Sequence, residues 1–262
     1  MKPSDLKLLV QKKYSEIATA PESDKSQSCC TGGCCSTGTY TVFSEDYSHL
    51  EGYNPDADLS LGCGIPVEFA RIKPGDHILD LGSGAGNDCF VARALTGDDG
   101  YVTGIDFTEA MVAKAEENRK RLGYTNVGFV RGDIEEMPLP DNTFDIVVSN
   151  CVLNLVPDKR KAFGEIMRVL KPGGHFCVSD VVIRGTLSDK ARTDAELYAG
   201  CVAGASSMDE YLNIIRQSGF IDLTVHKEKR IELPDDILSG PGGDSESGVY
   251  SITVSANKSK KS

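Results

Sequence analysis

Three cysteines of this chain stand in short segments rich in glycine and small apolar residues. They are Cys63 in Gly62-Cys63-Gly64, Cys151 directly after Asn150, and Cys201 in Gly200-Cys201-Val-Ala-Gly204. Because they are far apart in the sequence, no local zinc-finger spacing joins them. Soft, thiophilic centres select thiolates over carboxylates or imidazoles, so three converging thiols would suit such a centre. Each cysteine taken alone is also explained as a small buried residue.

A glycine-rich segment indicates a second kind of chemistry. Asp80-Leu-Gly-Ser-Gly-Ala-Gly86 follows an apolar run at 77–81 and precedes helical apolar spacing at 87–95. The glycines therefore lie in a strand-to-helix turn, where a ligand can approach the backbone closely. Their spacing is G-x-G-x-G, whereas dinucleotide-binding loops need G-x-G-x-x-G, and no P-loop lysine follows.

Two acids follow the next two predicted strands. Asp106 ends the strand expected at 100–106, and Asp133 follows the strand expected at 126–131. The carboxyl ends of parallel strands are where open α/β sheets bind ligands, and a carboxylate at the second strand can accept both ribose hydroxyls. The alternative is that both acids are solvated turn residues.

The glycine loop, Asp106 and Asp133 in this order resemble the nucleoside site of class I S-adenosylmethionine-dependent methyltransferases. The resemblance implies S-adenosylmethionine as cofactor, with Asp80 near its methionine amino group and Asp133 near its adenine amino group. Met111 is expected either to touch the adenine or to pack inside its helix. The cofactor-binding residues predicted in this way are Asp80, Gly82, Ser83, Gly84, Gly86, Asp106, Phe107, Met111, Asp133, Ile134 and Asn150.

The three cysteine segments carry a more specific resemblance. Leu61-Gly-Cys63-Gly-Ile-Pro66, Asn150-Cys151-Val-Leu-Asn154-Leu155 and Tyr198-Ala-Gly-Cys201-Val-Ala-Gly-Ala205 are similar to the cysteine motifs of arsenite methyltransferases. The resemblance implies that Cys63, Cys151 and Cys201 bind trivalent arsenic, delivered as a thiol conjugate of arsenite. It also implies a thiol reductant, such as thioredoxin or a small thiol.

An N-terminal cluster, Cys29-Cys30-Thr-Gly-Gly-Cys34-Cys35, lies in a Ser/Gly/Cys-rich arm. Cys30 and Cys34 have a permissible zinc spacing, but vicinal pairs without a nearby partner make a poor tetrahedral site, so no metal site is predicted. The resemblance implies that Cys29 or Cys30 takes part in catalysis as a resolving or arsenite-capturing thiol. The alternative is a dispensable tail.

Transfer of a methyl group to arsenic needs no general base, because arsenic has no proton to lose. This agrees with the histidines, none of which lies in a recognisable catalytic motif. Two other functions stay open. One is a small-molecule C- or O-methyltransferase whose cysteines are structural. The other is a non-catalytic thiol protein that binds arsenic or another soft metal. Cys89 and Cys177 are expected in the core.

Composition limits the partners. The net charge is −11, from 39 acidic and 28 basic residues, which disfavours nucleic acid and anionic membranes as partners. No apolar run approaches membrane-spanning length, and the first residues do not resemble a signal peptide. Nine cysteines in an acidic chain of this kind favour a reducing, cytoplasmic location.

Alternating strand and helix patterns must position these residues. They predict an α/β fold: a doubly wound, Rossmann-like sheet of seven strands, mostly parallel, with an antiparallel edge hairpin. Gly173-Gly174 is the expected break between the fifth helix and the fifth strand. We expect two regions, an N-terminal helix and cysteine-rich arm at 1–50 and a methyltransferase domain at 51–262. A helical insertion is expected near 188–204.

Overall fold

A computed structural model describes residues 3–19, 44–185, 204–231 and 247–260. Its centre is a seven-stranded sheet in the order β3-β2-β1-β4-β5-β7-β6. Strands β1 to β5 run parallel, and β7 runs antiparallel to both of its neighbours, as predicted. The strands are β1 (His77–Leu81), β2 (Tyr101–Asp106), β3 (Val127–Arg131), β4 (Phe144–Asn150), β5 (Leu170–Arg184), β6 (Ile221–Ile231) and β7 (Gly248–Asn257).

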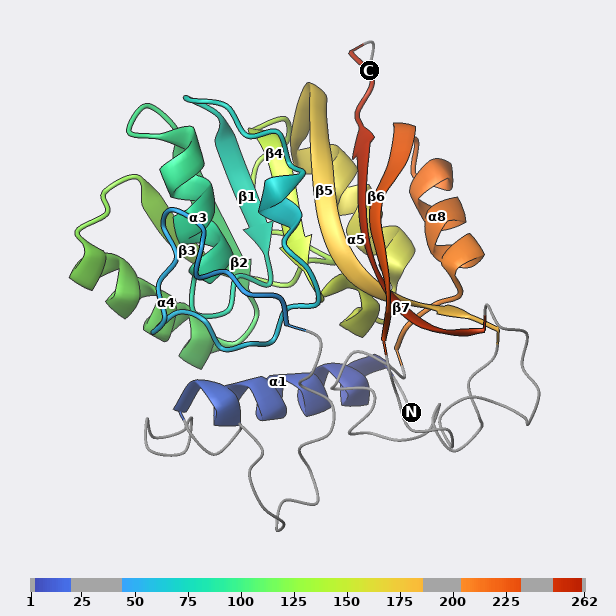
Figure 1. Ribbon diagram of the computed structural model, residues 1–262, viewed down its shortest axis with the longest axis horizontal. Coiled ribbons are helices and arrows are strands. Elements are labelled where there is room, and N and C mark those ends of the chain that lie inside the picture. Colours follow the sequence, from blue (N-terminus) through green and yellow to red (C-terminus); the bar gives the residue numbers. More distant parts are fainter. Residues whose placement is uncertain (1–2, 20–43, 186–203, 232–246, 261–262) are drawn as a thin grey trace.

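Helices cover both faces of the sheet (Figure 1). They are α1 (Pro3–Thr19), α3 (Asn87–Thr96), α4 (Glu109–Leu122), α5 (Lys159–Val169) and α8 (Met208–Gln217), with short 3-10 turns η1 (Pro66–Glu68) and η2 (Leu153–Leu155). Within the described ranges, no helix is long and apolar enough to cross a lipid bilayer.

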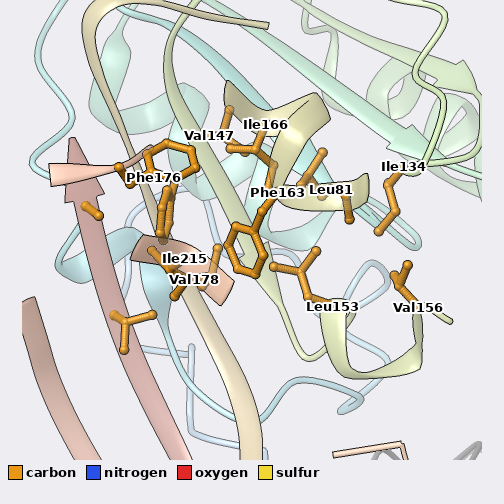
Figure 2. Packing of buried hydrophobic residues seen from close by; sticks show 14 of the residues in the cluster. Leu81, Ile134, Val147, Leu153, Val156, Phe163, Ile166, Phe176, Val178 and Ile215 are labelled. Atoms are coloured by element: carbon orange, nitrogen blue, oxygen red, sulfur yellow. The ribbon is translucent and has the colours of Figure 1, made fainter. Parts of the chain in front are cut away.

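The core divides into two clusters because successive strand residues point to opposite faces. Ile78 packs with Phe90 of α3 on one face, whereas Leu81 packs with Phe163 of α5 on the other. Figure 2 shows this second cluster, in which rings from α5 and β5 meet side chains of η2 and α8. The Phe163 ring lies 5.6 Å from that of Phe176 and perpendicular to that of Tyr211 at 5.7 Å. This packing fixes the carboxyl ends of β1 and β4 relative to each other.

Helix α1 lies across the carboxyl ends of the central strands, on the side to which β1 points (Figure 1). Lys7 anchors it there, since its ammonium group contacts the carboxylates of Asp133, at 2.5 Å, and Glu135. Near the other end of α1, the Lys114 ammonium of α4 donates to the carbonyl of Ala18 at 3.4 Å. The helix thereby covers the carboxyl ends of these strands.

The start of β5 differs from the prediction. The strand begins at Leu170, directly after α5, and not after a break at Gly173-Gly174. Gly173 has a positive φ of 83° and donates its N–H to the carbonyl of Lys258, while the Lys258 N–H donates to Gly174. Pairing with Lys258, beyond β7, therefore keeps both glycines inside the sheet. The helical insertion predicted near 188–204 lies outside the described residues, except for Gly204.

Candidate active site

A pocket opens at the carboxyl ends of β1, β2 and β4, beneath α1. Its wall includes the glycine loop, the start of α3, the segments after β2, β3 and β4, part of the segment 47–62, and three residues of α1, namely Lys7, Val10 and Tyr14. Nine of the residues predicted for the site lie in this wall: Gly82, Ser83, Gly84, Asp106, Phe107, Asp133, Ile134, Asn150 and Cys151.

The glycine loop wraps around the end of β2. The N–H groups of Gly82 and Ser83 both donate to the carbonyl of Ile105, at 2.8 and 3.1 Å. Gly82 and Gly84 have φ angles of 66° and 51°, in the left-handed region that favours glycine. A Cβ at Gly84 would meet nothing within 4 Å, so this part of the backbone is open to a ligand.

Asp106 joins the loop to the end of β2. Its carboxylate accepts N–H groups from Gly84, at 3.1 Å, and from Thr108, at 2.8 Å. Burial raises the pKa of Asp106 above its usual value, and these two N–H groups oppose that rise. The side chain is fixed by the backbone while still lining the pocket.

Three predicted cofactor residues lie behind the pocket wall. Asp80 is buried and accepts a hydrogen bond from the Cys89 thiol at 3.2 Å. Burial and then the Asp80 carboxylate raise the pKa of Cys89 well above its usual value, so the thiol remains a donor. Gly86 packs against the Phe90 ring, and Met111 is fully buried in α4. Among the described residues, neither Gly86, Met111 nor Asp80 belongs to the lining.

Asp88 lines the pocket but was missing from the sequence prediction. It lies in the first turn of α3, and its carboxylate accepts from the Tyr47 hydroxyl at 2.7 Å and from the Asn150 amide at 3.3 Å. Burial raises its pKa to about 6, although both hydrogen bonds oppose this shift. Its position in the sequence, two residues after the last glycine of the loop, could have indicated that Asp88 lines the pocket.

Asp133 lies where the sequence predicted, at the end of β3. One carboxylate oxygen contacts Lys7, and the other accepts the N–H of Glu135 at 2.9 Å. Ile134 follows it in the pocket wall. The Asp133 carboxylate therefore forms an ion pair with Lys7 of α1.

The structure places two of the three predicted thiol ligands near each other. Cys151 lines the pocket directly after β4 with a φ of 59°, and its N–H donates to the carbonyl of Ser179 at 2.7 Å. Cys63 is buried just behind the lining. Burial, then Asp180, then the thiols of Cys63 and Cys151 raise the pKa of Tyr211 well above its usual value. The Cys63 N–H donates to the side-chain oxygen of Asn150, the residue before Cys151, at 3.0 Å, so the two thiol-bearing segments lie next to each other.

The Tyr211 hydroxyl belongs to a buried polar cluster. Tyr211 donates to the Asp180 carboxylate at 2.9 Å, and burial raises the pKa of Asp180 to about 7 despite the charge of Lys159. The Lys159 ammonium donates to the carbonyls of Asn154, Val156 and Gly204 at 3.0 to 3.3 Å. It thereby links the turn after Cys151 to Gly204.

The other predicted thiols, Cys201, Cys29 and Cys30, lie outside the described residues. Cys89 and Cys177 are fully buried in the cluster that contains Phe90, as expected. Burial raises the pKa of Cys177 to about 12, so its thiol stays protonated at neutral pH.

Residues 72–219 match the family described as a methyltransferase domain. The chain is 37% identical to the arsenite methyltransferase of Halobacterium salinarum, over 98% of this chain and 67% of that protein. It is 35% identical to the arsenite methyltransferase of Aquipseudomonas alcaligenes, over 85% of this chain and 65% of that protein. The chain thus spans about two thirds of the length of these curated relatives.

Among solved structures, an arsenic(III) S-adenosylmethionine methyltransferase from Chlamydomonas reinhardtii is similar, with a TM-score of 0.64 and 36% identity. The match covers 76% of this chain and 68% of that one. With the glycine loop and strand-end acids, these similarities define an S-adenosylmethionine-dependent methyltransferase. Within that class, the chain belongs to the arsenite methyltransferase family.

Proposed function

We propose that this enzyme transfers methyl groups from S-adenosylmethionine to trivalent arsenic held by the thiolates of Cys63, Cys151 and Cys201. One observation carries the proposal: Cys151 lies in the wall of the cofactor pocket, and the Cys63 N–H donates at 3.0 Å to the side chain of Asn150, the residue before Cys151. The arsenite methyltransferases among its relatives support the choice of substrate.

The residues of the pocket fit the cofactor. Among the described residues, Ser83 lines the pocket, and its hydroxyl is buried and has no hydrogen-bond partner within the protein. Buried polar groups are normally paired, so a polar ligand is expected there. The open backbone at Gly84 allows a nucleoside to approach, and the Asp106 carboxylate is placed to accept ribose hydroxyls. Asp133 and Ile134 would border the adenine.

The methionine end of the cofactor would lie at the start of α3. Asp88, whose carboxylate lines the pocket, is better placed than Asp80 to meet the amino group directly. We assign Asp80 the indirect role of holding the loop through Cys89. The N-terminus of α3 favours negative charge, which suits the methionine carboxylate.

The proposed chemistry requires positioning more than proton transfer. Each thiol loses its proton to a hydroxide ligand of arsenite, which leaves as water, or to the departing thiol of a conjugate. Three thiolates then hold arsenic with its lone pair directed away from the sulfur atoms. Bound S-adenosylmethionine supplies an electrophilic methyl group, whose bonding electrons remain on the departing sulfur. Alignment of the reacting atoms can supply on the order of 7–11 kcal/mol in favourable cases.

Methylation oxidises trivalent arsenic to the pentavalent state. A thiol reductant, such as a small thiol or thioredoxin, restores the trivalent state and is itself oxidised to a disulfide. We assign Cys29 or Cys30 to this exchange as a resolving thiol.

Single serine substitutions at Cys63, Cys151 and Cys201 test the proposal. Each is expected to weaken arsenite binding and abolish its methylation, while the affinity for S-adenosylmethionine persists. Cys177→Ala, a buried thiol inside β5, is the matched control and should keep both. Arsenite can be followed by near-ultraviolet difference absorption of the arsenic–sulfur bonds, and the cofactor by calorimetry. Full methylation of arsenite by Cys151→Ser would contradict the proposal.

A further inference from the structure

The side-chain amide of Asn150 is bound to the segment that carries Cys63. Its oxygen accepts the N–H groups of Cys63, at 3.0 Å, and of Gly64, at 3.3 Å. Its nitrogen donates to the carbonyl of Gly64 at 2.8 Å. Because Asn150 is the residue before Cys151, one side chain connects both thiol-bearing segments, although 87 residues separate Asn150 from Cys63.

These bonds use the whole hydrogen-bonding capacity of the amide. An asparagine side chain offers two lone pairs and two N–H groups. The lone pairs of Asn150 receive two backbone N–H groups, while its nitrogen also reaches the Tyr47 hydroxyl at 2.8 Å and Asp88 at 3.3 Å. A bond from this amide to the cofactor would therefore require giving up one of these bonds.

The two segments fit together without spare space. A Cβ at Gly62 would lie 2.4 Å from the Asn150 amide nitrogen, so the close approach requires a glycine. On the other side of the segment, the Ser251 hydroxyl donates to the carbonyl of Cys63 at 2.5 Å. The backbone around Cys63 is thus held both from β4 and from β7.

We propose that Asn150 is a positioning residue, which sets the separation of the Cys63 and Cys151 thiols for arsenic rather than binding the cofactor. The inference rests on the proposed function and makes it more specific. It replaces the prediction from sequence that Asn150 binds S-adenosylmethionine. Loss of the amide should leave both thiols present but no longer held at the spacing that trivalent arsenic requires.

The test compares Asn150→Leu with Asn126→Leu. Leucine is close to asparagine in size and removes every hydrogen bond of the amide. Asn126 is a matched control, since its nitrogen donates to the carbonyls of Gly97, at 2.9 Å, and Gly100, at 3.0 Å. It precedes β3 at the amino end of the strands, away from the pocket. Both variants are titrated with arsenite and, separately, with S-adenosylmethionine.

Asn150→Leu is expected to weaken arsenite binding about tenfold or more, as expected for the loss of one to two hydrogen bonds, with cofactor affinity within about twofold of wild type. Asn126→Leu should change neither affinity. If Asn150→Leu does not fold, Asn150→Asp replaces it, since it keeps the acceptor for Cys63 and loses the donor to Gly64. The same result is then expected for this variant, namely weaker arsenite binding with a cofactor affinity within about twofold of wild type.

Two other results would overturn the inference. Weaker cofactor binding with unchanged arsenite affinity would make Asn150 a cofactor ligand. Unchanged affinity for both would leave it no role in positioning. Cys151→Ser is measured in parallel. If that variant also binds arsenite normally, the thiolate site itself is wrong, whereas an effect of Cys151→Ser alone would contradict only the role of Asn150.

Discussion

Carboxylates dominate the chemistry of the pocket at the scale of single residues. Asp80 and Asp106 are buried near the glycine loop, Asp88 is half-buried there, and desolvation raises the pKa of each of them. Burying a carboxylate without a cation is unfavourable. A ligand that carries positive charge relieves this cost, and S-adenosylmethionine carries both an ammonium and a sulfonium group. The pocket is therefore suited to the positively charged groups of the cofactor.

Cofactor binding is expected to depend on pH through Asp88. Its raised pKa, about 6, means that the carboxyl is largely protonated at pH 5 and ionised at pH 7. The affinities for S-adenosylmethionine and S-adenosylhomocysteine should therefore both rise across this interval, because both carry the protonated amino group that the ionised Asp88 carboxylate attracts. Calorimetry at several pH values measures the two affinities. Asp88→Asn should flatten the profile, and affinities independent of pH between 5 and 7 in the wild type would contradict the assignment.

At the scale of elements, α1 covers the part of the pocket that contains Asp133. Lys7 pairs with Asp133 and Glu135, while Val10 and Tyr14 from the same helix line the pocket. The ion pair is partly exposed, with 34% of the Lys7 side chain accessible, so its contribution is modest and sensitive to salt. The helix is held by a few contacts over a ligand site.

Lys7→Met is expected to loosen α1. The amides of the helix should exchange hydrogen faster, and S-adenosylmethionine should bind up to about fivefold more weakly, in line with an exposed ion pair. Hydrogen exchange detected by mass spectrometry, with and without cofactor, measures the change. Lys12→Met, on the exposed part of the same helix, serves as control. Unchanged exchange in Lys7→Met would show that the ion pair does not hold α1.

The sequence predicted these elements better than it predicted contacts between them. Apolar strands, glycine spacing and strand-end acids correctly located the loop and Asp106, because strand ends meet at one edge of a parallel sheet. The sequence did not show that Asp88, and not Asp80, faces the pocket, because that depends on the turn at Gly82 and the rotation of α3. The Lys7–Asp133 contact joins residues 126 positions apart, which spacing rules do not detect.

At the scale of the whole molecule, the sheet brings distant segments to one place. β4 ends at Asn150, the Cys63 segment packs against it, and Lys159 links the following turn to Gly204. Glycine-flanked cysteines far apart in sequence can form one site only in this way. In the sequence, Gly204 lies three positions after Cys201.

The most direct test of this account is methyl transfer itself. The purified chain is incubated with arsenite, methyl-labelled S-adenosylmethionine and excess thiol, and the arsenicals are separated by chromatography with mass detection. The account predicts labelled methylarsenicals and matching formation of S-adenosylhomocysteine, both absent in Cys151→Ser. If the wild-type chain binds the cofactor but labels no arsenic, the thiols are a pocket lining or an arsenic trap, and the central claim is wrong.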